Sequence, residues 1–142
     1  MKISFILPPP NLSGGIKVTA IYAKALVVRG HDVTLISPMH QKRAYKDCFK
    51  SLLKGNGWLA RQPFYKSHLD GLNLDYRVLD CFRPIINSDV PDSDVVIATW
   101  WETAEWVNKL SEEKGVKVYF VQGHEVFPHL PVERVRATYK LP

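Results

Sequence analysis

The sequence lacks the features that mark several large classes of protein. Its two cysteines, Cys48 and Cys81, form no metal-ligand spacing. No uncharged apolar run reaches the roughly 18 residues that a membrane-spanning helix needs, and no repeat or low-complexity tract is present. The apolar run after Lys2 does not make an export signal, because three prolines cut it short and no small-residue cleavage site follows. These absences predict a globular, cytoplasmic protein with reduced thiols.

Three phosphate-handling motifs are missing as well. A dinucleotide-binding chain would carry G-x-G-x-x-G and an acidic residue about 20 positions later, whereas here Gly14 and Gly15 stand alone and Ser37 is followed by Pro38. The P-loop pattern G-x-x-x-x-G-K-[ST] does not occur. A phospho-acceptor receiver would need acidic residues after the first strand, where this chain has proline. A reductase, a P-loop NTPase and a receiver domain are therefore disfavoured.

What the sequence does have is the composition of one globular domain. Its 142 residues are 46% hydrophobic and 23% charged, and a chain of this length can bury an adequate core. We therefore expect a single domain over residues 1–142. The formal net charge of +5 is unevenly placed, because the stretch 39–73 holds seven Lys or Arg residues against two Asp residues and so carries the whole excess.

Within that basic stretch, residues 43–54 can form a helix whose lysines recur every four positions. These are Lys42, Lys46, Lys50 and Lys54. A solvated helix face is one interpretation, and attraction to an anionic membrane surface is the other. Nucleic acid is not expected as a partner, because aromatic residues interleaved with base-reading side chains are missing. The lipid interpretation would place the protein peripherally at the inner face of a membrane.

Hydrophobic periodicity predicts alternating strands and helices. Residues 3–7 read as a buried strand whose odd positions point one way and whose even positions point the other. A helix at 16–29, ended by Gly30, and a strand at 31–37 complete a βαβ unit. Further strands are predicted at 74–80, 95–98 and 116–121, and further helices at 99–115 and 132–139.

These elements predict an α/β fold, a Rossmann-like three-layer sandwich around a parallel sheet. Right-handed crossovers give the strand order 3-2-1-4-5, in which the first and fourth strands flank the point where the order reverses. Ligands of open parallel sheets bind beyond the carboxyl ends of the strands near that point. The residues expected there are Asn11 to Gly15, Ser37, Thr99 to Glu102 and Gln122 to Glu125.

Two of these edge segments lead into helices. Ser13 is a good N-cap, and the unpaired N–H groups of the helix that it opens favour an anion such as phosphate. Gly14 and Gly15 either let a ligand approach the backbone closely or serve only a tight connection. Thr99, followed three residues later by Glu102, has the spacing of a capping box.

The candidates for chemistry on this edge are His124 and Glu125, an adjacent acid–base pair. Histidine titrates near neutrality and can donate, accept or shuttle a proton. A loop histidine bonded to the backbone is the alternative interpretation. Trp100 and Trp101 are either packing residues or a ligand platform, and packing is the favoured interpretation.

Four segments, taken in order, resemble a known enzyme family. They are Pro-Pro-Asn-Leu-Ser-Gly-Gly-Ile at 9–16, Gly-His-Asp-Val-Thr-Leu-Ile-Ser at 30–37, Asp-Val-Val-Ile-Ala-Thr-Trp at 94–100 and Tyr-Phe-Val-Gln-Gly-His-Glu at 119–125. Their order and spacing resemble the N-terminal domain of GT-B glycosyltransferases. The closest group is the retaining family 4, with its rhamnosyl- and mannosyltransferase-like members.

The resemblance implies two Rossmann-like domains that face a cleft, with the acceptor on the N-terminal domain and the nucleotide-sugar donor on the C-terminal domain. Gly14 and Gly15, with Ser13 beside them, match the glycine loop that approaches the donor phosphates. His124 falls near the histidine beside the reacting sugar and is therefore the catalytic candidate. The acceptor-side candidates are Asn11, Thr99, Trp100 and Glu125.

The implied activity is transfer of a sugar from a nucleotide-sugar donor to a glycan, lipid or polysaccharide acceptor, with no metal or cofactor. The chain stops at Pro142, before the family's donor domain and its paired glutamates, so the resemblance implies a fragment that is inactive alone. A different class stays open from the residues themselves. It is a stand-alone binding module that uses the glycine turn for a phosphorylated small molecule.

Overall fold

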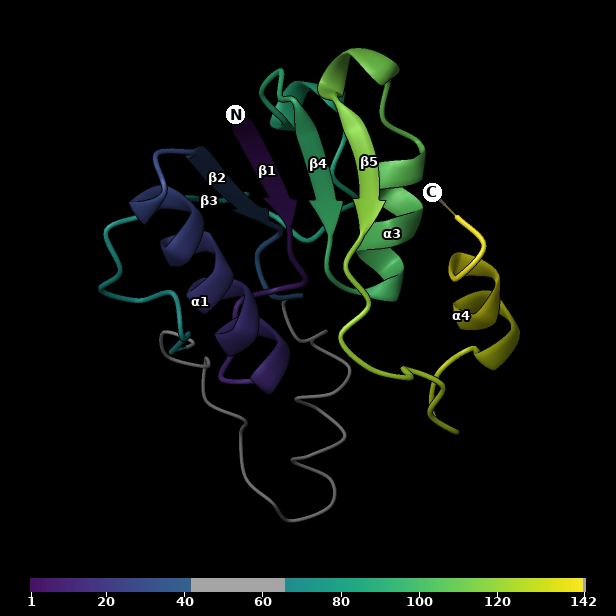
Figure 1. The fold of residues 1–142 in the computed structure, drawn as a ribbon. Helices are drawn as coiled ribbons and strands as arrows, with labels where there is room; N and C mark the ends of the chain where they lie inside the picture. Colours follow the sequence, from purple (N-terminus) through teal and green to yellow (C-terminus); the bar gives the residue numbers. More distant parts are fainter. Residues whose placement is uncertain (42–65, 142) are drawn as a thin grey trace.

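The computed structural model describes residues 1–41 and 66–141 and contains a parallel sheet covered by helices (Figure 1). The strands are β1 (Lys2–Ile6), β2 (Asp32–Ser37), β3 (Asp75–Val78), β4 (Val95–Ala98) and β5 (Val116–Tyr119). The helices are α1 (Gly14–Val28), α3 (Trp101–Asn108) and α4 (Val132–Thr138), with the 3-10 turns η1 (Asn87–Asp89) and η2 (Glu112–Lys114). The strand order is β3-β2-β1-β4-β5 and every pairing is parallel. The predicted α/β fold and strand order are confirmed.

The predicted basic helix at 43–54 lies outside the described residues, and so do its lysines Lys42, Lys46, Lys50 and Lys54. The membrane-surface hypothesis therefore stays a prediction. Within the two described ranges, no helix is both long enough and apolar enough to cross a membrane.

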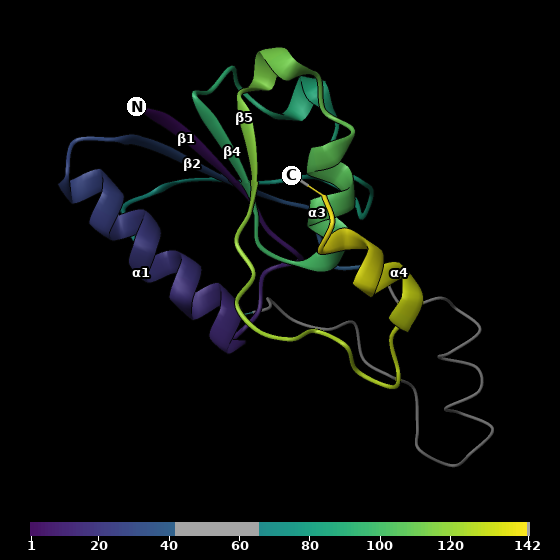
Figure 2. The same ribbon diagram turned by 45° about the vertical axis from the view of Figure 1, so that its right-hand side comes forward.

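The middle strand β1 divides the core into two halves. Its odd positions Ile3 and Phe5, and Leu7 just beyond, pack with α1, whereas Ile6 packs with α3. Figure 2 shows the resulting layers, with α1 on one face of the sheet and α3 and α4 on the other. A strand that is apolar on both faces belongs in the centre of such a sheet. The alternation predicted for residues 3–7 is thus confirmed.

Helix α1 starts and stops where the sequence indicates. Ser13 is its N-cap, and Ile16, Ala20 and Ala23 are buried against the sheet. Gly30 follows the helix with φ of 83°, a left-handed conformation that favours glycine. The helix therefore delivers the chain directly into β2, and its N-terminus stays at the carboxyl edge of the sheet.

The capping box predicted from Thr99 and Glu102 is wrong. Trp100 is the N-cap residue of α3, and the hydroxyl of Thr103 accepts hydrogen bonds from the N–H groups of Thr99 (3.0 Å) and Trp100 (2.9 Å). The hydroxyl of Thr99 instead donates to the carbonyl oxygen of Ile6 (3.0 Å). That bond ties the end of β4 to the end of β1, so the Thr99 side chain does not serve the helix.

Helix α3 also ends earlier than the predicted Gly115. Its last residue is Asn108, and the N–H of Ser111 donates to Oδ1 of Asn87 (2.9 Å) instead of continuing the helix. Gly115 follows η2 with φ of 111°, and a Cβ atom there would overlap the carbonyl oxygen of Ser93. This glycine serves the close approach of two turns before β5.

The short helix predicted at 132–139 is confirmed as α4, and it packs on α3. The guanidinium of Arg134 donates to the carboxylate of Glu105, with Nε 2.6 Å from Oε1. Its carbon Cζ also lies 5.1 Å from the ring centroid of Trp101, a cation–π contact. These contacts hold the segment that follows β5 against the α3 side of the molecule.

Candidate functional site

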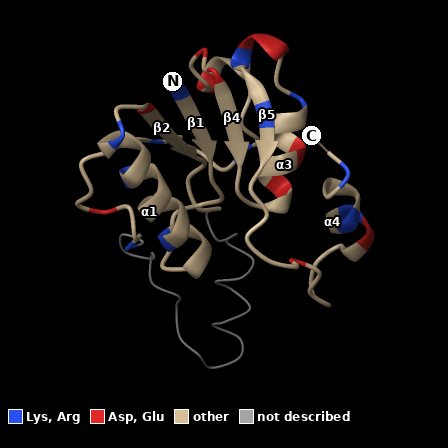
Figure 3. Ribbon diagram, viewed as in Figure 1, with Lys and Arg blue, Asp and Glu red and all other residues tan. Residues whose placement is uncertain are grey.

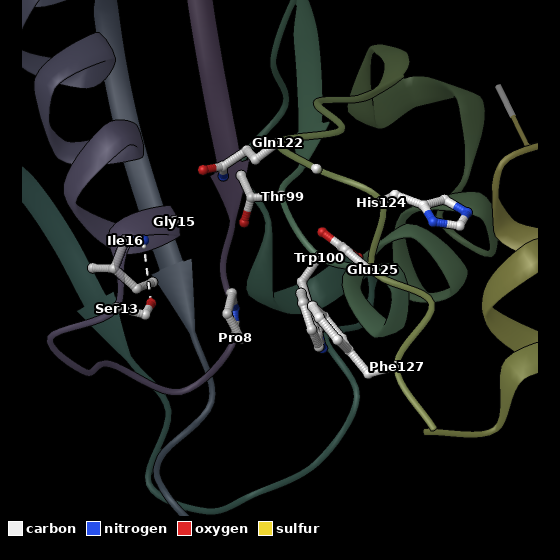
Figure 4. Close-up of a pocket in the computed structure, with 11 residues that line it drawn as sticks. Pro8, Ser13, Gly15, Ile16, Thr99, Trp100, Gln122, His124, Glu125 and Phe127 are labelled. Carbon is white, nitrogen blue, oxygen red and sulfur yellow. Dashed lines mark hydrogen bonds between the residues drawn. The ribbon is translucent and has the colours of Figure 1, made fainter. Parts of the chain in front are cut away.

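A pocket of about 300 Å³ lies beyond the carboxyl ends of β1, β4 and β5 (Figure 4). Three segments that are far apart in the sequence line it. Pro8, Ser13, Gly15 and Ile16 come from the β1–α1 connection, Thr99 and Trp100 follow β4, and Gln122, Gly123, His124, Glu125 and Phe127 follow β5. The pocket therefore sits where the strand order reverses, the position predicted for a ligand site.

One wall of the pocket is the N-terminus of α1. The Ser13 hydroxyl accepts from the N–H of Ile16 at 3.5 Å, and Oδ1 of Asn11 accepts from the N–H of Ser13 at 2.8 Å. The N–H groups of Gly14 and Gly15 have no hydrogen-bond acceptor among the described residues, and the first turn contains no acidic residue. Two free donors at a helix N-terminus suit an anion.

The β5 segment closes over this helix through Gln122. Its Nε2 donates to Oγ1 of Thr19 in α1 at 3.3 Å, while its Oε1 is buried without a partner among the described residues. A Cβ atom at Gly15 would lie 3.3 Å from that Oε1, whereas at Gly14 it would meet nothing within 4 Å. Gly15 therefore makes room for Gln122, and Gly14 faces open space.

The two adjacent tryptophans have different surroundings. Trp101 is buried, packs beneath Arg134, and has an Nε1 without a partner among the described residues. Trp100 is half-buried and lines the pocket, as Phe127 also does (Figure 4). Phe127 is 44% exposed. The aromatic surface of the pocket thus comes from Trp100 and Phe127.

Glu125 is the most constrained polar residue of the pocket. It is only 5% exposed, and its Oε2 accepts from the N–H of Trp101 (3.1 Å) and from the hydroxyl of Tyr119 (2.9 Å). Its own N–H donates to the hydroxyl of Tyr139 (2.8 Å). Burial raises the pKa of Glu125, and the hydrogen bonds from Tyr119 and Trp101 partly oppose that rise. Burial and the neighbouring carboxylate raise the pKa of Tyr119 in turn.

The other carboxylate oxygen of Glu125 is not used in this way. Oε1 accepts no hydrogen bond from the described residues, and Glu125 is one of the residues that line the pocket. Figure 4 shows the Glu125 side chain directed between Trp100 and Gln122. A buried residue with one free acceptor at the pocket surface can bind a hydrogen-bond donor of a ligand.

His124 lines the pocket through its position in the chain but is exposed, and Figure 4 shows its imidazole turned away from Ser13 and Gly15, toward α4. The ring stacks on Tyr139 with 6.1 Å between centroids. Of the adjacent acid–base pair, the acid therefore points into the pocket and the base stands at its rim.

The pocket has little positive charge of its own. None of the described residues that line it is Lys or Arg. Figure 3 shows that the acidic residues of η2 and of the turn before β4 lie at the opposite edge of the sheet. Across residues 1–41 and 66–141, no group of three His, Cys, Asp or Glu side chains could hold a metal ion. The described lining therefore offers a ligand hydrogen-bonding groups and apolar surface.

Most of the site residues predicted from the sequence come together at this pocket. Those that line it are Ser13, Gly15, Thr99, Trp100, His124 and Glu125. Asn11 and Gly14 lie outside the lining, and Asn11 shapes the turn before Ser13. Ser37 also lies outside it, because its hydroxyl is paired with that of Tyr76 at 2.8 Å.

Five lining residues had no predicted role: Pro8, Ile16, Gln122, Gly123 and Phe127. Gln122 was on the predicted edge but carried no predicted role. Phe127 follows β5 by eight residues with no periodic pattern, so nothing in the sequence marks it as part of the pocket. It reaches the pocket through the path of the chain after β5.

No family model, curated protein or solved structure matches this chain.

Proposed function

We propose that this chain is the acceptor-side domain of a GT-B glycosyltransferase, which transfers a sugar from a nucleotide-sugar donor to an acceptor. One observation carries the proposal. Three of the four segments that resemble the family, at 9–16, 94–100 and 119–125, lie far apart in the sequence and line the same pocket. The fourth segment, at 30–37, is β2 in the same sheet.

The residues have distinct roles in this proposal. The free N–H groups of Gly14 and Gly15 would meet the donor phosphates from the acceptor side. Trp100 and Glu125 would hold the acceptor, with Asn11 and Thr99 shaping the walls around it. His124 would act at the rim, beside the reacting sugar, where a second domain carrying the donor would approach.

A binding module for a phosphorylated small molecule is the second candidate. The observation that favours it is the same pair of unpaired N–H groups at Gly14 and Gly15, together with a first helical turn that holds no acidic residue. Such a module needs no second domain. It would bind inorganic phosphate or a sugar phosphate tightly as the 142-residue chain alone.

The reading frame beyond codon 142 and its product distinguish the two candidates. A continuing frame with a second βαβ pattern and two glutamates eight residues apart would support the glycosyltransferase. The product of that frame should transfer sugar from a nucleotide donor, whereas the 142-residue chain should neither transfer sugar nor bind the donor tightly. A frame that ends at codon 142, with tight phosphate binding by the chain, would favour the binding module.

His124→Ala tests the catalytic role in the longer product. We expect kcat to fall by about tenfold or more, with a smaller change in donor affinity, because an interaction made mainly in the transition state shows in the rate. His129→Ala is the matched control, since His129 is an exposed histidine of the same segment that does not line the pocket. Equal kcat values for the wild type and His124→Ala would remove His124 from the site.

A further inference from the structure

We propose that the pocket binds an uncharged carbohydrate ring, whose apolar face packs on Trp100 and Phe127 and whose hydroxyl group donates a hydrogen bond to the free Oε1 of Glu125. The inference deepens the proposed function, because it names the acceptor as a neutral sugar and not a lipid phosphate or another anion. Its test, however, depends only on the pocket.

The charge of the pocket disfavours an anionic ligand. Its described lining contains no Lys or Arg, and it contains the carboxylate of Glu125. An anion placed between Trp100 and Gln122 would face that carboxylate at close range, and no Lys or Arg of the described lining would compensate it. Like charges in a poorly hydrated site repel strongly. The free N–H groups of Gly14 and Gly15 lie across the pocket at the start of α1, so an anion bound there would not fill this space.

The carboxylate of Glu125 has one oxygen, Oε1, that can accept a hydrogen bond from a ligand. Glu125 is nine-tenths buried, and Oε2 is fully engaged by the N–H of Trp101 and the hydroxyl of Tyr119. These two bonds, with that from the Glu125 N–H to Tyr139, fix the carboxylate and leave Oε1 without a partner among the described residues. A carboxylate oxygen held in one position favours a ligand group that donates a hydrogen bond. The hydroxyl of a sugar is such a donor, whereas the dianion of a phosphate monoester has no proton on its phosphate oxygens.

Trp100 and Phe127 give the pocket an aromatic surface. Trp100 and Phe127 leave their rings partly exposed next to Glu125 (Figure 4). A pyranose ring has an apolar face of C–H groups and a rim of hydroxyl groups. A site that combines apolar surface with a few fixed polar groups matches both parts. The pocket volume of about 300 Å³ accommodates one such ring.

The test uses the 142-residue chain and defined probes. Uncharged methyl glycosides of mannose, rhamnose and glucose, glucose 1-phosphate and inorganic phosphate are titrated separately while backbone amide shifts are followed by NMR. We expect at least one methyl glycoside to shift the amides of residues 99–101 and 122–127, with saturation transfer from aromatic protons to the sugar ring. Glucose 1-phosphate and phosphate should bind these residues more weakly or not at all.

Two variants address the two contacts. Phe127→Ala removes the exposed ring and should weaken glycoside binding. Phe82 is 38% exposed and does not line the pocket, so Phe82→Ala should leave binding unchanged. Glu125→Gln can keep an oxygen for Trp101 and Tyr119 but replaces the free acceptor with an NH₂ group. It should therefore weaken binding about tenfold, the loss expected for a hydrogen bond to a charged acceptor.

Several outcomes would overturn the inference. They are no glycoside-induced shift at the pocket even at the highest soluble concentration, stronger binding of phosphate than of glycosides at residues 122–127, and unchanged binding by Glu125→Gln. These outcomes are separate from the fate of the proposed function. If the longer product transfers sugar but its pocket binds no glycoside, the proposed glycosyltransferase function stands and the inference of a neutral sugar acceptor fails. If the pocket binds glycosides but the protein transfers no sugar, the inference about the pocket stands and the proposed glycosyltransferase function fails.

Discussion

At the scale of single residues, the adjacent glycines of α1 differ in what surrounds them. Gly14 faces open space, and Gly15 faces Oε1 of Gln122. Neither has a positive φ, so their backbone conformations are open to other residues. The need for glycine at the second position therefore comes from a side chain that reaches across from the β5 segment.

Gly14→Ala and Gly15→Ala form a matched pair that measures this difference. Gly14→Ala should stabilise the protein by about 0.4–1 kcal/mol, because alanine has fewer unfolded conformations and fits without contact. Gly15→Ala should gain less or lose stability, because Gln122 must shift by a few tenths of an ångström. Chemical denaturation of both variants provides the measurement, and equal gains would show that Gln122 does not constrain Gly15.

The sequence predicted which residues lie at the carboxyl edge better than it predicted which of their side chains point into the pocket. Both His124 and Glu125 were placed correctly at the carboxyl edge, because that edge follows from the strand order. Which of them points into the pocket depends on Tyr119, Tyr139 and the Trp101 N–H, and all three belong to different elements. No local pattern encodes such a set of contacts, so the burial of the acid and the exposure of the base could not be foreseen.

At the scale of elements, the start of α3 depends on one buried hydroxyl. Oγ1 of Thr103 accepts from the N–H groups of Thr99 and Trp100 and donates to the carbonyl of Trp100 at 2.8 Å. The sequence predicted the existence of this helix correctly but named Thr99 as its cap. The prediction failed because Thr99 bonds to Ile6 in a neighbouring strand, a contact that the spacing of residues along one helix does not reveal.

Thr103→Val tests that arrangement. Valine has nearly the same shape but leaves two backbone N–H groups without an acceptor, so we expect a loss of about 2 kcal/mol or more in the free energy of unfolding. Thr103→Ser keeps the hydroxyl and should cost about 1 kcal/mol for the lost methyl group. Urea denaturation of both variants measures the difference, and a smaller loss for valine than for serine would contradict the proposed capping role.

At the scale of the whole molecule, stability should depend on pH through groups that act in opposite directions. Burial raises the pKa of Glu102 and Glu125 above their ordinary value of 4.5. The side chains of Arg77 and Arg83 lower the pKa of Asp75 and Asp89, respectively, below 3.8. The glutamates thus contribute stability below pH 4.5 that is lost as pH rises through their folded pKa values. The aspartates contribute stability above pH 3.8 that is lost as pH falls.

Glu125→Gln tests how the raised pKa of Glu125 affects stability. Glutamine does not ionise, so the variant should gain stability relative to the wild type as pH rises from 4 to 8, by about 1.4 kcal/mol for each unit of pKa shift. Asp89→Asn should behave in the opposite way, with its deficit relative to the wild type greatest at neutral pH and smaller below pH 3.8. Urea denaturation across this range measures both, and a pH-independent difference for Glu125→Gln would contradict the expected shift.

The central position of β1 also governs the order in which a newly made chain can complete its sheet. Lys2 pairs with Asp32 on one side, and Ile3 pairs with Val95 on the other. On a ribosome, the first pairing can form long before the partner of the second has been synthesised. At the usual 5–20 residues per second, the nascent chain carries an unpaired edge of its central strand for on the order of 10 s. An unpaired strand edge can pair with another chain during that interval, and the pocket, whose last wall contains Glu125, forms after it ends.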